Sequence, residues 1–302
     1  MLRPLFLPLV GCLGFLAVSP AGARPLSAEG PLVLENNDLV VLLGDTLVER
    51  DGNYGHLETA LTAAYAGKNV KFRNLGWSGD TPRCESRSYF GPPAEGFERL
   101  KVILGNIKPT VVICCYGAVD SWKGEAGHAD FLASYGKLLD MVKESTGGAG
   151  VVLLGPPATQ TLPPPYPDLT AHNKDVEATG KAIAGFAKER GLRYGDLYGA
   201  MAGLKVDSSN GVTFTESGYA AMTPAFLKAL QAPAAPAAPP AGLRELVQEK
   251  NQLFFYRWRP QNEIYLFGAR KHEQGNNASE VQLFEPLVAE KETAIQALLG
   301  KK

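Results

Sequence analysis

The stretch from Asp38 to Arg50 reads Asp-Leu-Val-Val-Leu-Leu-Gly-Asp-Thr-Leu-Val-Glu-Arg. Its segment from Leu39 to Leu43 is apolar without interruption, which is typical of a parallel strand that is buried on both faces. Residues 44–46 end that run, and residues 55–65 then carry apolar side chains at helical spacing. The turn therefore joins a central strand to a helix at the carboxyl edge of a sheet, where open α/β sheets bind their ligands.

Strands and helices are expected to alternate along the next part of the chain. The strands are predicted over residues 68–75, 110–116, 150–154 and 192–197, and the helices over residues 96–107, 128–143, 173–190 and 215–230. This alternation predicts a parallel sheet in a three-layer α/β/α sandwich. The loops at the strand ends should then converge on one site.

The first residues have the pattern of a secretory signal peptide. A short basic start, residues 1–3, is followed by an apolar run to Val18 and by Ala-Gly-Ala at residues 21–23. We therefore expect residues 1–23 to be removed and the protein to be periplasmic or extracellular. Leu9 to Cys12 also resembles a lipoprotein signal, which leaves lipidation as the alternative. No later segment approaches the ~20 apolar residues that span a bilayer, so we expect no transmembrane helix.

Charge and cysteine content exclude several classes of function. The 30 Lys and Arg residues balance 31 Asp and Glu residues, which argues against nucleic acid as the partner. Cys114 and Cys115 lie within an apolar strand and point to opposite faces, which indicates buried side chains and not a redox pair. The chain has no histidine or cysteine cluster at metal-ligand spacing and no phosphate-binding glycine motif, so we expect neither metal nor cofactor.

The chain is expected to divide into a main domain and a C-terminal extension. The main domain covers residues 32–230, and residues 231–242 form a semi-rigid linker of proline and alanine. The extension, residues 243–302, contains a helix over 243–252, an aromatic and basic segment, and a final helix over 284–299. Because it is so apolar, we expect it to dock on the main domain.

Four segments together resemble the conserved blocks of the SGNH hydrolases, the GDSL esterase and lipase family. Gly44-Asp45-Thr46 stands where that family has Gly-Asp-Ser, and residues 74–81 resemble the block whose glycine, here Gly79, helps to form the oxyanion hole. Residues 116–120 resemble the third block, Gly-x-Asn-Asp, and residues 210–219 resemble the block that supplies the catalytic histidine. The resemblance implies an SGNH hydrolase-like, flavodoxin-like sandwich and an esterase that acts on O-acyl esters of carbohydrates or small molecules.

Four positions depart from the pattern of that family. Thr46 replaces the nucleophilic serine, Thr213 replaces the histidine, Asn210 replaces the acid, and Val119 replaces the asparagine of the oxyanion hole. A threonine hydroxyl cannot accept a proton from another hydroxyl near neutral pH, so no general base stands at the expected position. We therefore expect hydrolysis to be weak or lost.

Two other groups could supply a base. His272 lies beside Glu273 on the extension and could reach the site from outside the main domain, while Asp207 could act as a displaced carboxylate. Of the remaining histidines, His56 is interpreted as a surface or packing residue, and His128 and His172, each at the start of a helix, as solvent or capping residues. The side chains expected to bind a ligand are Asp45, Trp77, Asp120 and Trp122.

Three functions remain open from the sequence. The first is an exported hydrolase with Thr46 as nucleophile, and the second is a pseudoenzyme whose cleft binds a glycan or acyl ligand. The third is a partner-binding protein that uses the aromatic segment Phe254 to Phe267, since Tyr, Trp and Arg are enriched at interfaces. That extension resembles one carried by exported SGNH-like proteins of planctomycete-type bacteria. The sequence leaves the oligomeric state open.

Overall fold

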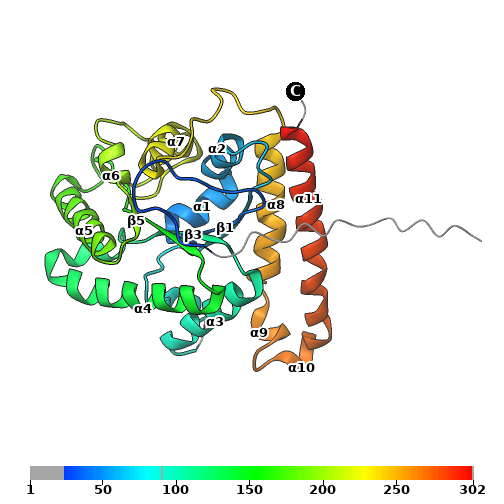
Figure 1. Ribbon diagram of the computed structural model, residues 1–302. Coiled ribbons are helices and arrows are strands. Elements are labelled where there is room, and N and C mark those ends of the chain that lie inside the picture. The colour runs from blue at the N-terminus through cyan, green and yellow to red at the C-terminus, as the bar shows by residue number, and fades with distance from the viewer. Residues whose placement is uncertain (1–23, 90, 301–302) are drawn as a thin grey trace, which may run out of the picture.

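The computed structural model describes residues 24–89 and 91–300, so the expected signal peptide lies outside the described residues. Five parallel strands form one sheet with the order β2-β1-β3-β4-β5 (Figure 1). The strands are β1 (Leu39–Gly44), β2 (Lys71–Gly76), β3 (Val111–Cys115), β4 (Gly150–Leu154) and β5 (Arg193–Gly195). The α/β fold predicted from the sequence is confirmed.

Helices cover both faces of this sheet because side chains alternate along each strand. Val40 and Leu42 pack in the cluster formed with α1 (Thr46–Tyr54), α2 (His56–Ala64), α6 (Leu197–Ala200) and α7 (Glu216–Leu230). Val41 and Leu43 pack in the opposite cluster with α3 (Pro93–Ile107), α4 (His128–Thr146) and α5 (Thr170–Glu189). Cys114 and Cys115 are buried free thiols within β3.

The first helix begins earlier than the sequence indicates. The sequence predicts a helix from Gly55, whereas α1 already begins at Thr46, where the Asp45 carboxylate caps it by accepting from the Leu47 amide at 3.2 Å. Gly55 lies between α1 and α2 in the left-handed conformation with φ of 71°. Glycine adopts this conformation without steric cost, so the chain can turn there from one helix into the next. Three short 3₁₀ helices follow later: η1 (Glu85–Arg87), η2 (Asp120–Lys123) and η3 (Glu125–Gly127).

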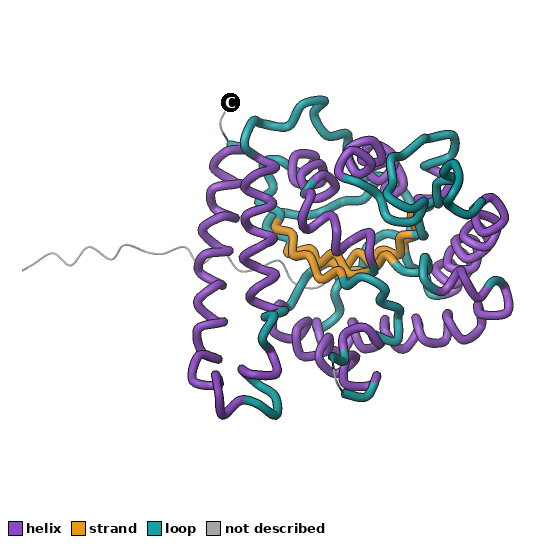
Figure 2. The backbone as a smooth tube through the Cα atoms, turned by 180° about the vertical axis from the view of Figure 1, so that it is seen from behind, coloured by secondary structure: helices purple, strands orange, loops and turns teal. Residues whose placement is uncertain are grey.

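The C-terminal extension forms two long helices beside the sheet (Figure 2). They are α8 (Leu243–Trp258) and α11 (Phe284–Leu299), and the segments between them are α9 (Glu263–Leu266), α10 (Lys271–Gln274) and η4 (Gly275–Leu283). Helix α8 packs against β2, α1 and α2. It extends beyond the predicted end at Gln252 because Phe254, in its last turns, is buried in the core.

Buried polar contacts join α8 to the edge strand. Lys250, only 1% exposed, donates to the Phe72 carbonyl of β2 at 2.6 Å and forms an ion pair with the buried Glu58 of α2. The side-chain amide of Asn251 donates to the other Glu58 oxygen at 2.8 Å. An exposed edge strand would present unpaired backbone groups. Helix α8 therefore covers the edge of the sheet at β2.

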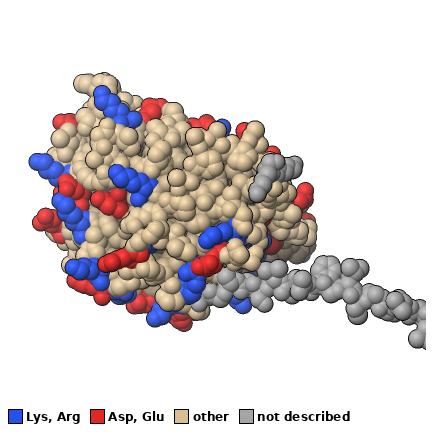
Figure 3. All heavy atoms as spheres, turned by 45° about the horizontal axis from the view of Figure 1, so that its top comes forward, with Lys and Arg blue, Asp and Glu red and all other residues tan. Residues whose placement is uncertain are grey.

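The face shown in Figure 3 carries basic and acidic side chains side by side, with broad areas that carry neither. Within residues 24–89 and 91–300, no helix combines the length and the apolar composition that a membrane crossing requires.

Candidate active site

Thr46 lies at the carboxyl end of the central strand. It is the first residue of α1, its side chain is half-buried, and its Oγ1 accepts a hydrogen bond from the Gly79 amide at 3.2 Å. Gly79 has a φ of 74°, a conformation that favours glycine. The Tyr219 hydroxyl on α7 donates to the Leu47 carbonyl at 2.8 Å. The first turn of α1 is therefore held by two loops that are distant in sequence.

A small cavity of about 140 Å³ lies beside Thr46. It combines expected site residues from three loops, namely Asp45 and Thr46 after β1, Val119 and Trp122 after β3, and Thr213 before α7. Six further residues line the cavity although the sequence did not predict that they bind a ligand: Leu47, Ala118, Pro157, Val212, Phe214 and Tyr219. Two of these residues could have been predicted from the sequence. Pro157 follows strand β4 and Tyr219 lies in the last conserved block, and both positions belong to the sheet edge at which Thr46 lies.

Asn210 is exposed and lies outside the cavity lining. Its side-chain oxygen accepts hydrogen bonds from the amides of Val212 and Thr213, at 3.0 and 2.7 Å. The Asn210 side chain therefore stabilises the turn that presents Thr213 to the cavity. An aspartate could accept the same two hydrogen bonds.

Two residues expected to bind a ligand lie elsewhere. Trp77 is buried against the extension, where its ring is 5.8 Å from the Trp258 ring and 3.4 Å from the Arg259 guanidinium. Asp120 is buried and accepts a 2.6 Å hydrogen bond from Arg83. Neither side chain lines the cavity at Thr46. Both expectations followed from loop position, which does not specify the direction of a side chain.

Asp45 is the carboxylic acid that lines the cavity, and its protonation is unusual. Its pKa is raised to about 7, mainly by burial and also by the nearby charges of Asp80 and Asp120, while the hydrogen bond from the Leu47 amide opposes the shift. The Asp80 pKa is also raised, because burial outweighs its pairing with Arg87. The floor of the site is therefore a low-dielectric region in which negative charge is disfavoured.

None of the described histidines lines this cavity. His172 was expected to be a solvent or capping residue, which is wrong: it is buried, and its ring stacks on the exposed ring of Trp122 with centroids 3.5 Å apart. His56 lies beside Glu216, His128 bonds to Thr179, and His272 is exposed on α10. Since His172 supports Trp122 from behind, it contributes to the shape of the cavity wall.

Asp207 does not line the cavity either. Its carboxylate accepts hydrogen bonds from the hydroxyls of Thr215 and Ser217, both at 2.8 Å, at the start of α7. These bonds lower its pKa, so Asp207 is a weaker base than an ordinary aspartate. In the described part of the chain, no group of three or more His, Cys, Asp or Glu side chains is arranged to hold a metal ion.

The model of the GDSL-like lipase/acylhydrolase family matches residues 42–221. This match runs from within β1 into α7 and includes the Thr46 turn and the Thr213 loop, and the chain belongs to that family. It ends before the linker and the C-terminal extension. No protein of curated function matches the chain.

Solved structures share the fold at low sequence identity. A catalytic variant of Axe2, an acetylxylan esterase from Geobacillus stearothermophilus, is 16% identical with a TM-score of 0.51, over 68% of this chain and 99% of that one. BT4096, a diltiazem-metabolizing enzyme of a gut microbe, is 14% identical with a TM-score of 0.51, over 69% of this chain and 48% of that one. Identities this low support a shared fold and no shared substrate.

Proposed function

We propose that this protein binds small O-acyl esters, on carbohydrates or other small molecules, in the Thr46 cavity and hydrolyses them very slowly or not at all. The observation that carries the proposal is the composition of the cavity wall. The Gly79 amide, at the position of the family's oxyanion donor, lies 3.2 Å from Thr46 Oγ1 and so stands beside the point where an oxyanion would form, but Thr213 stands where the family supplies a base.

The groups beside Thr46 are poor replacements for that base. The Asp45 carboxylate accepts from the Leu47 amide, and no hydrogen bond joins it to Thr46 Oγ1. Burial raises the pKa of Tyr219 well above its usual value, so this phenol stays protonated near neutral pH. Removing one member of a triad already removes most of the rate that the triad supplies.

The dimensions of the cavity favour a short acyl group. Its volume of about 140 Å³ is small for a ligand site. A short acyl group fits such a space, and the exposed ring of Trp122 at its rim offers a flat surface for a sugar or another ring. Aromatic faces with a few polar groups are typical of ligand sites.

We also propose that the protein is exported and that the division into main domain (32–230), linker (231–242) and extension (243–302) holds. Export is supported by the pattern of residues 1–23. The contacts of α8 with β2, α1 and α2 support an extension that packs on the main domain.

Hydrolysis of 4-nitrophenyl acetate tests the functional proposal. The wild type and Thr46→Ala should have equally low rates, while Thr46→Ser combined with Thr213→His should raise kcat/KM by about 100-fold or more, because a base is restored. Thr46→Ser alone is the matched control and should remain slow. Wild-type kcat/KM on the order of 10⁴ M⁻¹s⁻¹, lost in Thr46→Ala, would show an active threonine nucleophile and refute the proposal.

A further inference from the structure

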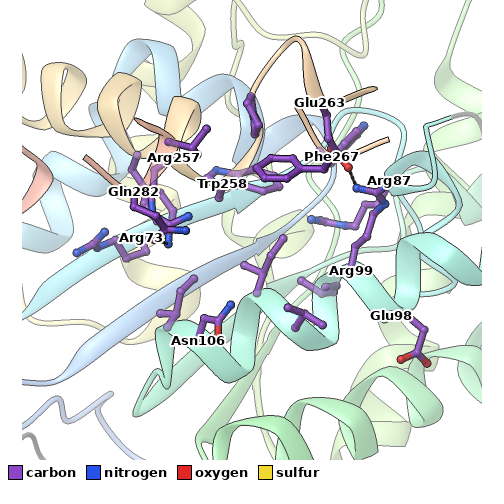
Figure 4. Close-up of a pocket in the computed structure, with 18 of the residues that line it drawn as sticks. Arg73, Arg87, Glu98, Arg99, Asn106, Arg257, Trp258, Glu263, Phe267 and Gln282 are labelled. Atoms are coloured by element: carbon purple, nitrogen blue, oxygen red, sulfur yellow. Dashed lines mark hydrogen bonds and ion pairs between the residues drawn. The ribbon is translucent and has the colours of Figure 1, made fainter. Parts of the chain in front are cut away.

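A second and larger cavity, of about 730 Å³, lies between α3 and the C-terminal extension (Figure 4). It shares no lining residue with the Thr46 cavity. Much of its wall is apolar, with contributions from Leu100, Ile103 and Ile107 of α3 and from Phe254, Trp258 and Val281 of the extension. All the lining residues that the extension contributes lie outside the segment that matches the family model, so this cavity depends on the extension.

Polar side chains gather at two ends of the cavity, with Trp258 between them. Figure 4 shows Arg73, Arg257 and Gln282 at one end and Arg87, Arg99, Glu98 and Glu263 at the other. Arg73 pairs with Glu285 at 2.9 Å, and Arg99 pairs with Glu95 at 2.6 Å and also with Glu263. Four arginines and four glutamates line the cavity, so its wall carries little net charge and disfavours a multiply charged ligand.

Arg87 is the unusual member of this wall. Its side chain is only 2% exposed, its Nε donates to Asp80 at 2.6 Å, and its Nη2 donates to the Leu75 carbonyl at 2.9 Å. Its buried Nη1 has no hydrogen-bond partner within the described residues. A buried charged donor without a partner costs free energy, and an acceptor brought by a ligand would recover it.

Other arginines of the cavity wall also have buried nitrogens without a hydrogen-bond partner in the described part of the chain. The buried side-chain atoms of its lining residues that lack a hydrogen-bond partner among the described residues are all arginine nitrogens: Nε of Arg73, Arg99 and Arg257 and Nη1 of Arg87. Two of them are partly compensated, since Arg73 Nε lies 2.8 Å from Glu292 and Arg257 Nε lies 3.8 Å from Glu285. Asp80 Oδ1 and Glu292 Oε1 also lack a hydrogen-bond partner among the residues that the structure describes, but they belong to residues outside the lining. Arg87 Nη1 and Arg99 Nε therefore remain as donors of the lining residues, and a ligand would have to bring the acceptor.

We propose that this cavity binds a small amphipathic monoanion, with a carboxylate at the Arg87 and Arg99 end and an aliphatic chain along α3 and Trp258. Guanidinium groups match the planar geometry of a carboxylate. Cavities of this size, mostly apolar with a few placed polar groups, are typical small-molecule sites. The Thr46 cavity is too small for such a chain, so the two sites take different ligands.

Isothermal titration calorimetry of the purified protein with sodium dodecanoate tests this assignment. We expect one molecule of dodecanoate to bind per chain. Dodecanol lacks the anionic group and acetate lacks the aliphatic chain, so each should bind at least about tenfold more weakly. Equal binding of dodecanol would refute the anionic site. If acetate or inorganic phosphate binds as tightly as dodecanoate, the cavity does not bind an aliphatic chain and the proposal is refuted.

Two variants locate the ligand. Arg87→Gln removes the buried charge and Ile103→Phe fills the cavity, and each should weaken dodecanoate binding by about tenfold or more. The matched controls are Arg190→Gln, at an ion pair with Asp140 away from the cavity, and Leu132→Phe on α4. Circular dichroism shows whether each variant is folded; should Arg87→Gln unfold, Ile103→Phe and the dodecanol comparison still decide.

The proposal is overturned when dodecanoate binding survives Ile103→Phe but is lost on filling the Thr46 cavity with Val119→Trp. It is also overturned when sedimentation shows a dimer that Ile103→Phe dissociates, because a second copy of the chain would then occupy this surface.

Discussion

Replacing Lys250 by methionine should loosen the C-terminal extension from the main domain. Lys250 and Glu58 are buried, with side chains 1% and 2% exposed, and Lys250 also donates to the Phe72 carbonyl of the edge strand. Methionine keeps most of the apolar stem of lysine and removes the ammonium group. Glu58 then keeps one hydrogen bond, from Asn251, in a site closed to water.

The expected loss of stability is about 3–5 kcal/mol, which is the usual cost of removing one partner of a buried ion pair. At roughly 2–4 °C per kcal/mol for a chain of this size class, the melting temperature should fall by about 6–20 °C. The large cavity should open as well, because Phe254 and Trp258 on α8 form part of its wall. The loss comes mainly from the uncompensated Glu58 charge, so it should shrink when that charge is also removed.

Urea unfolding followed by tryptophan fluorescence measures this loss. Lys291→Met is the matched control, because Lys291 pairs with the exposed Glu249 and an exposed pair contributes less than about 1 kcal/mol. The double variant Glu58→Leu with Lys250→Met should recover much of the lost stability. If Lys250→Met costs no more than Lys291→Met, the buried pair does not anchor the extension and the reasoning is refuted.

Two further predictions concern the strand ends. Because the folded-state pKa of Asp45 is raised from 3.8 to about 7, the folded protein retains a proton there that the unfolded chain releases, so stability from this group falls as pH rises between these values. Between pH 4.5 and 7.5 the urea midpoint of Asp45→Asn should therefore fall less than that of the wild type. If the two midpoints change equally with pH, Asp45 does not have this effect. Gly76→Ala should lower the stability by about 3 kcal/mol or prevent folding, since a Cβ atom there would lie 2.1 Å from the Glu49 backbone nitrogen. The control is Gly185→Ala, in open space on α5, which should stabilise the protein slightly. Thermal unfolding measures both variants. A Gly76→Ala protein as stable as the wild type would contradict the close packing of β2 on α1.

The sequence alone predicts the sheet because its information is local. An apolar run such as Leu39 to Leu43 indicates a buried strand, and turn residues such as Gly44 to Thr46 mark its end. Parallel strands place such ends at one edge, so motif order is enough to predict that the loops of Thr46, Val119 and Thr213 lie near one another. The substitutions at these positions are likewise visible without coordinates.

Tertiary structure decided the directions of the side chains and the spaces between elements. Trp77 and Trp122 both follow strands in glycine-containing loops, yet Trp77 packs against Trp258 of the extension and Trp122 lines the Thr46 cavity on a stacked His172. The cavity at Arg87 depends on how α8 docks beside α3, about 150 residues away in the chain. Local sequence patterns do not predict how two helices so far apart in the sequence pack together, because the energy of docking comes from buried contacts that exist only once the chain has folded.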